Sequence, residues 1–232
     1  MHQPSLKHTG VKPWVVKLLQ LSVLCVLLYY TQRLVRISLL YSGFETDVGF
    51  LRHKPKALFE NRIWLYAFFT HALLSMLVLL AGFTQFSRLL MRKYPRVHRR
   101  VGQLYCFNII FIVAPTGFVM GLYASGGWLG RSAFCTLAVL WWLTTFMAYI
   151  AAKRRQFKQH QYWIIYSFAL TLSAITFRII LTYMRTHANM PPMQTYGLAS
   201  WLGFLPNVLV AFFIIQYIER KSMYKQKRSF YD

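Results

Sequence analysis

Runs of about twenty mostly apolar residues recur along the whole chain, and they leave few folds open. At about 1.5 Å of rise per residue, each run is long enough to cross a hydrocarbon core about 30 Å thick as a helix. Of the 232 residues, 56% are hydrophobic and 14% are charged, a balance that excludes disordered chains and ordinary soluble folds. The sequence therefore predicts an all-α polytopic membrane helical bundle.

Polar residues divide the apolar runs into six predicted transmembrane helices, which form one integral membrane domain over residues 1–232. The predicted spans are 13–32, 63–87, 100–123, 132–151, 161–183 and 199–218. Between the first two spans, the apolar positions of residues 34–41 have helical spacing, which predicts an amphipathic piece lying on the membrane surface. In the third span we expect Pro115 to kink the helix, and Gly117 and Gly121 to let a neighbour approach closely.

The charge of the chain is unbalanced, with 27 Lys and Arg against five Asp and Glu. These basic residues lie between apolar runs and not along one face, which argues against nucleic acid and favours membrane lipids as partners. Three lie in the N-terminal tail (Lys7, Lys12 and Lys17), six in 88–100, four in 153–158 and five in the basic tail 219–232. Because cytoplasmic loops retain Lys and Arg, these segments and both termini are predicted to be cytoplasmic, in a bacterial inner membrane.

Polar side chains at membrane depth are the candidates for function, because they are unfavourable in hydrocarbon. No Asp or Glu lies in a predicted span, which argues against a carboxylate-based proton pump. Counting the helix rise places His71, Asn108 and Asn207 within about 6 Å of one level near the midplane. The three are predicted to form a polar cluster that either binds a haem or quinone or hydrogen-bonds the helices together.

Two histidines lie at the predicted cytoplasmic boundary, His98 before the third span and His160 before the fifth. Both helices run outward, so the imidazoles share a depth and could ligate one b-type haem, with Arg99 available to its propionates. A pH-responsive or metal-binding pair, or residues that merely lie among lipid head groups, are the alternatives. Arg178, near the outer side of the fifth span, is expected to hold a substrate or propionate or to snorkel to head groups.

No catalytic residue is assigned. Cys25, Cys106 and Cys135 lack the spacings of metal or redox motifs, and no Ser/His/Asp or paired-carboxylate arrangement is present in the sequence. Whether the chain is an enzyme is therefore left open.

The order and spacing of certain residues resemble a bacterial family of membrane proteins catalogued as domain of unknown function 2306, over about residues 63–215. The matching positions are Trp64 with His71, Gly82 to Phe86, His98 to Tyr105, Gly126–Gly127, Phe134, Trp141 or Trp142, His160 to Trp163, Ala169–Leu170, Arg178, and Pro206–Asn207. The family pattern has an arginine where this chain has Tyr166, and a tryptophan where it has Phe204.

The resemblance extends to function only by analogy, since the histidine-bearing helices of the family are similar to those of dihaem membrane cytochromes of the b type. Those proteins need four histidines on four helices, whereas this chain offers His71, His98 and His160, which leaves room for one haem. The first hypothesis is therefore a haem- or quinone-interacting electron-transfer protein. The alternative is a non-enzymatic transport, binding or accessory protein, partnered by another membrane subunit, in which the histidines fix helix packing.

Overall fold

The computed structural model describes residues 12–231, so the N-terminal tail with Lys7 lies outside the described residues. The elements are α1 (Pro13–Leu39), η1 (Leu51–His53), α2 (Ala57–Glu60), α3 (Arg62–Gln85), α4 (Arg88–Lys93), α5 (Pro95–Asn108), η2 (Ile109–Val113), α6 (Ala114–Leu122), α7 (Gly127–Lys153), α8 (Phe157–His187), α9 (Pro192–Leu202) and α10 (Leu205–Tyr231). Within this range, six helical stretches are long and apolar enough to cross a membrane. The all-α fold with six spans is confirmed.

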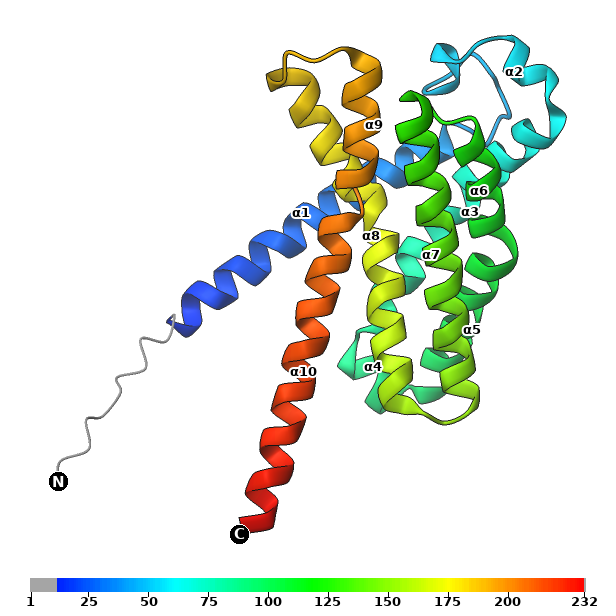
Figure 1. The fold of residues 1–232 in the computed structure, drawn as a ribbon. Coiled ribbons are helices and arrows are strands. Elements are labelled where there is room, and N and C mark those ends of the chain that lie inside the picture. Colours follow the sequence, from blue (N-terminus) through cyan, green and yellow to red (C-terminus); the bar gives the residue numbers. More distant parts are fainter. Residues whose placement is uncertain (1–11, 232) are drawn as a thin grey trace.

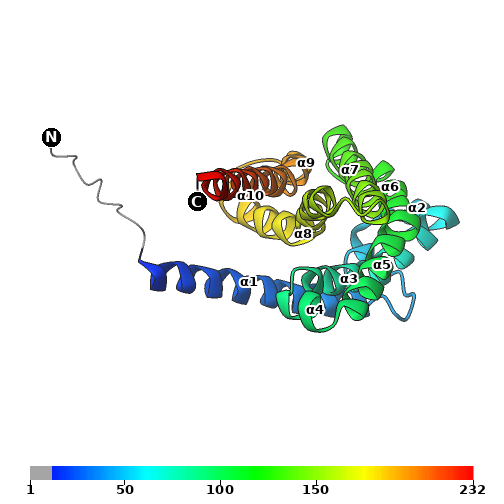
Figure 2. The same ribbon diagram turned by 90° about the horizontal axis from the view of Figure 1, so that it is seen from below.

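Four of the spans form a bundle. α3 and α7 each pack against both α8 and the α5–α6 span, so α5 and α8 lie diagonally across the bundle from each other (Figure 2). α9 and α10 pack on α8, and α1 extends obliquely away from the bundle (Figure 1). We call the end with α4 and the α7–α8 turn the α4 end, and the opposite end, with α2 and the α8–α9 turn, the α2 end.

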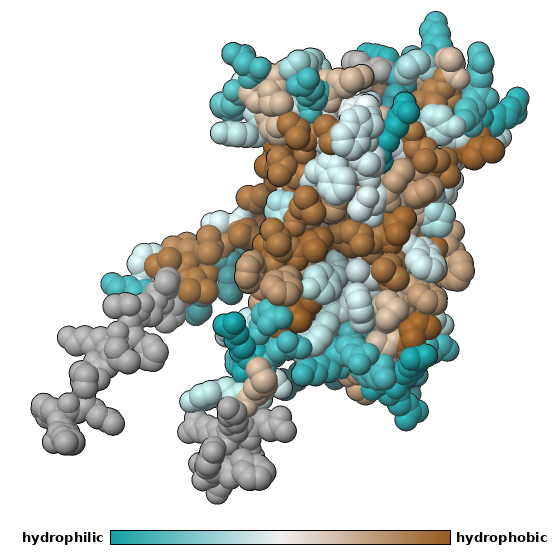
Figure 3. Space-filling view, viewed as in Figure 1, coloured by the Kyte–Doolittle hydropathy of each residue, from teal (hydrophilic) through white to brown (hydrophobic). Residues whose placement is uncertain are grey.

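The surface of the molecule is that of a membrane protein. On the face that Figure 3 shows, an apolar band crosses the middle of the bundle, and hydrophilic residues gather at both ends. Side chains such as Leu19 on α1 and Phe213 on α10 are 66% and 67% exposed, which is stable only where hydrocarbon replaces water. The basic segments 88–100 and 153–158 lie together at the α4 end, as their sequence grouping predicted.

Local sequence explains where several spans begin. The side chain of Asn61 accepts the backbone N–H of Trp64 at 3.1 Å and caps α3. Pro95 and Pro192 occupy the first turns of α5 and α9. Backbone N–H groups in the first turn of a helix have no partner within the helix, so proline, which lacks an N–H, costs no hydrogen bond there. Gly126 starts α7 with φ of 90°, a left-handed conformation that glycine adopts without strain.

The first span runs further than predicted. α1 continues to Leu39, so residues 33–39 end a long helix and do not form a separate piece on the membrane surface. Leu34 and Tyr41 are buried against the bundle, whereas Leu40 is exposed. The prediction was wrong because no Gly or Pro interrupts residues 14–42, and the apolar stripe that indicated a surface helix packs against other helices instead.

The third and sixth spans are both interrupted. Residues Ile109–Val113 form a π-helical turn just before Pro115, so the expected kink is accompanied by a widened turn. In the sixth span, Gly203 and Phe204 separate α9 from α10, and Pro206 occupies the first turn of α10. Each interruption leaves backbone carbonyls that need partners from neighbouring helices.

Candidate functional site

His71 and Trp142 satisfy the carbonyls at the interruption of the third span. Pro115 has no N–H to donate to the carbonyl of Ile110, five residues earlier, and the indole N–H of Trp142 donates to that carbonyl at 3.1 Å. Nδ1 of His71 donates to the nearby carbonyl of Val113 at 2.8 Å. Donation from Nδ1 leaves the lone pair of the neutral imidazole on Nε2. His71 therefore fastens α3 to the interrupted span.

Asn108 and Asn207 also bond backbone carbonyls of neighbouring helices. Nδ2 of Asn108 donates to Leu74 of α3 at 3.1 Å, and Nδ2 of Asn207 donates to Ala169 of α8 at 3.2 Å. In the described part of the chain, no hydrogen bond joins these two side chains to each other or to His71. Two of the three predicted members of a midplane cluster, His71 and Asn108, thus join α3 to the third span, and Asn207 joins α10 to α8. No hydrogen bond among the described residues links the three into one site.

Gly117 provides the space that the His71 ring occupies. A Cβ at this position would lie 2.9 Å from Cε1 and 3.2 Å from Nδ1 of His71. We therefore expect Gly117→Ala to displace the imidazole, weaken its bond to Val113 and lower the free energy of unfolding by about 1–3 kcal/mol. Denaturant unfolding of the protein in detergent measures this loss. Gly43→Ala is the control, because a Cβ there meets nothing nearer than 3.6 Å; equal losses in the two variants would contradict the prediction.

His98 and His160 come together at the α4 end from the diagonal helices α5 and α8. The two rings lie within the range of electrostatic interaction with each other. Nδ1 of His160 donates to the carbonyl of Ala148 on α7 at 2.8 Å, so its Nε2 retains a free lone pair. Nδ1 of His98 is buried and has no hydrogen-bond partner among the described residues. Each ring therefore offers a nitrogen to a ligand.

The donor set at this pair suits a haem better than a bare metal ion. Over the described residues, no group of three His, Cys, Asp or Glu could hold a metal ion, whereas protein sites for zinc use three or four such ligands. A b-type haem takes only two axial ligands from the protein. Arg99 is exposed at the same end, as are Arg100, Arg154 and Arg155, where their charge is accessible to propionates.

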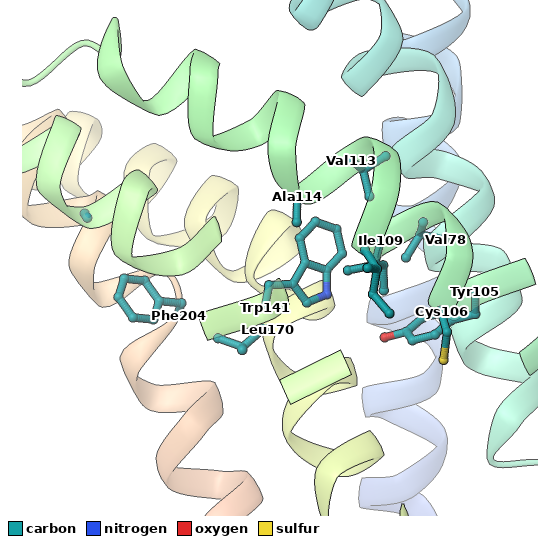
Figure 4. Close-up of a cluster of buried hydrophobic side chains, with 11 residues drawn as sticks. Val78, Tyr105, Cys106, Ile109, Val113, Ala114, Trp141, Leu170 and Phe204 are labelled. Atoms are coloured by element: carbon teal, nitrogen blue, oxygen red, sulfur yellow. The ribbon is translucent and has the colours of Figure 1, made fainter. Parts of the chain in front are cut away.

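A buried hydroxyl network, which the sequence analysis missed, lies deeper between the same helices. The Tyr105 hydroxyl lies 2.9 Å from Oγ of Ser167 and 2.9 Å from Oγ1 of Thr171. Nε1 of Trp141 donates to Thr171 at 3.0 Å, and Oγ1 of Thr145 lies 2.7 Å from Ser167. We call these five residues the Tyr105 network. Figure 4 shows Tyr105 and Trp141 within the cluster of buried side chains at the centre of the bundle.

The Tyr105 network lies deeper in the bundle than the two histidines. Tyr105 follows His98 by seven residues, and Ser167 follows His160 by seven, so the network lies about 10 Å deeper on both helices. Tyr105 is 1% exposed and joins the diagonal helices α5 and α8 directly. This equal seven-residue spacing is the signal in the sequence from which the network could have been found.

Arg178 lies on α8 towards the α2 end, away from the histidine pair. Its side chain is partly buried, and Nη1 donates to the carbonyl of Ala174 in the same helix at 2.7 Å. Its charge acts on the phenols of Tyr196 and Tyr41 and on the imidazole of His71. The structure therefore places Arg178 in a separate polar region, apart from His98 and His160.

Comparison with known proteins gives a family but no activity. Residues 68–215 match a family described as predicted membrane protein (DUF2306). No curated protein and no solved structure matches the chain significantly. The matched range contains the four-helix bundle with His71, His98, His160 and Arg178, and it is close to the 63–215 indicated by the residues themselves. Because it covers more than half of the chain, this protein belongs to the family of membrane proteins catalogued as domain of unknown function 2306.

Proposed function

We propose that this protein is an electron-transfer protein of the bacterial inner membrane that holds one b-type haem between His98 and His160. The observation that carries the proposal is the pairing of these imidazoles from diagonal helices, each with a ring nitrogen available. Histidines that ligate metals almost always donate their other ring N–H to a carbonyl, a carboxylate or water, and His160 does so to Ala148.

The surroundings of the pair support the same role. Arg99 and its neighbours supply positive charge at the α4 end, which the distribution of Lys and Arg favours as the cytoplasmic side. The Tyr105 network separates the pair from the centre of the bundle. When bound, the haem would supply one-electron chemistry, and a membrane-soluble quinone or another membrane subunit would serve as the partner in transfer.

Visible spectra of the full-length protein, expressed with adequate haem and purified in detergent, test the proposal. We expect a Soret band in the wild type. We expect His98→Gln and His160→Gln each to lose the haem during purification, and the band with it, because one axial ligand holds the haem more weakly than two. His187→Gln is the matched control, since His187 is exposed at the opposite end of α8. A pyridine haemochrome assay should give one b-type haem per chain.

Absence of a Soret band from the wild type, or its retention in both variants, would contradict the haem site. The packing bonds of His71, Asn108 and Asn207 favour a second candidate, a non-enzymatic membrane binding or accessory protein. That candidate predicts that His98→Gln and His160→Gln leave folded yield and cellular phenotype unchanged. Size-exclusion chromatography and circular dichroism of the variants separate loss of ligation from loss of folding.

A further inference from the structure

Arg178 carries a charge that the described part of the chain does not neutralise. A guanidinium stays protonated in proteins, and inside a membrane protein it needs oxygen partners. Of its five N–H donors, the structure uses Nη1, which bonds the carbonyl of Ala174. The groups on which its charge acts are phenols and an imidazole, and no carboxylate of the described residues is among them.

A second arginine extends this positive region to the surface. Arg178 and Arg185 lie seven residues apart on α8, so they share a face about 10 Å apart, and the charges of both act on the phenol of Tyr196. Arg185 is exposed and Arg178 is partly buried. The Tyr196 ring packs edge-on against Phe177, with centroids 5.3 Å apart, and lies 6.1 Å from the ring of Phe134. The hydroxyl is therefore held near both guanidinium groups.

Other groups at the α2 end add to the positive potential. Nζ of Lys54 donates to the carbonyl of Tyr123 and to Oγ of Ser125, each at 3.1 Å. Burial, together with the nearby charge of Arg131, keeps the pKa of Lys54 below its ordinary value. Cations that are crowded in this way attract anions to the site.

We propose that Arg178, Arg185 and Tyr196 form a binding site for the phosphate group of a membrane amphiphile. An arginine guanidinium can donate two parallel N–H hydrogen bonds to two oxygens of one phosphate, and a phenol can donate a further hydrogen bond. α9 also exposes Leu198 and Leu202 beside this region, by 37% and 44%, an apolar surface along which an acyl chain can lie. The site lies towards the opposite end of the bundle from the histidine pair and does not depend on haem.

Lipid titration of the delipidated full-length protein, followed by native mass spectrometry, tests this proposal. The probes are phosphatidic acid, phosphatidylcholine and inorganic phosphate. We expect one phosphatidic acid to bind the wild type more tightly than phosphatidylcholine, and Arg178→Gln to weaken that binding by about tenfold. Tyr196→Phe keeps the ring packing and removes only the hydroxyl, so we expect a loss of about threefold. Arg62→Gln, which removes an exposed arginine at the same end, should leave the affinity unchanged.

Wild-type affinity in Arg178→Gln would overturn the proposal. An equal loss in Arg62→Gln would also overturn it, because binding would then reflect general surface charge. Binding of inorganic phosphate without phosphatidic acid would overturn the amphiphile as the source of the phosphate. If Arg178→Gln does not fold, Arg178→Lys keeps the charge without the fork and should bind phosphatidic acid more weakly than the wild type. Unchanged affinity in both Arg178→Lys and Tyr196→Phe would then overturn the site.

Discussion

Tyr105→Ala is expected to lower the free energy of unfolding by about 3–5 kcal/mol. Tyr105 is 1% exposed and belongs to the main buried cluster. It also joins α5 directly to α8 through Ser167 and Thr171. These two helices lie diagonally across the bundle and are otherwise connected through α3 and α7, which pack against both. Truncation would leave a cavity and remove a hydrogen-bond partner from two buried hydroxyls at once.

Two further variants separate the contributions of the Tyr105 ring and hydroxyl. Tyr105→Phe removes the hydroxyl alone, and at about 0.6 kcal/mol per bond inside a membrane protein it should lower the free energy of unfolding by about 1 kcal/mol. Leu104→Ala is the surface control, because the Leu104 side chain is 56% exposed and faces lipid. Denaturant titration in detergent, followed by circular dichroism, measures all three. Equal losses in Tyr105→Ala and Leu104→Ala would contradict a central role for Tyr105.

Gly82→Leu is expected to prevent α3, α5 and α8 from packing together and to reduce the yield of folded protein severely. A Cβ at Gly82 would already lie 2.5 Å from Cε2 of Phe168 and 3.2 Å from Cε2 of Tyr105. Gly82→Ala should therefore lower the free energy of unfolding by about 1–3 kcal/mol, because a packed aromatic ring has to move. The larger side chain cannot be accommodated without separating the helices.

A double-mutant cycle checks that this close contact is the cause. Phe168→Leu replaces the ring that a Cβ at Gly82 would meet with a smaller side chain. The loss caused by Gly82→Ala should therefore be smaller when Phe168→Leu is already present. Thermal unfolding in detergent of the wild type, both single variants and the double variant gives the coupling energy. Strictly additive losses would show that Gly82 acts through something other than its contact with Phe168.

The depth of each polar residue could be predicted, because the rise of a helix is fixed. His98 and His160 precede spans that run in the same direction, so equal counting placed them at one level. The structure places the two rings within electrostatic range of each other. The same counting placed His71, Asn108 and Asn207 near one level, yet each bonds a different carbonyl. Depth comes from the helix rise, whereas the direction in which a side chain points depends on how each helix is rotated against its neighbours.

Polar residues of ordinary appearance in the sequence were missed for a related reason. Ser167, Thr171 and Tyr105 are uncharged residues that transmembrane helices accommodate readily, and only the diagonal placement of α5 and α8 makes them partners. His71 and Trp142 donate to carbonyls that are freed from the regular helical pattern by the π-helical turn before Pro115. Composition alone does not predict that turn.

The sequence by itself determined that the chain crosses a membrane six times, and it indicated which segments lie at the same end of the bundle. Both follow from the linear chain, because they depend only on the length of the apolar runs and on the distribution of Lys and Arg. Only the tertiary structure decided that His98 lies within electrostatic range of His160, that Tyr105 joins α8, and that Arg178 lies apart with Tyr196. Lipid is as apolar as a helix interface, so the buried and lipid-facing sides of a span carry nearly the same residues. Close packing at glycines and hydrogen bonds to freed carbonyls then select the neighbours.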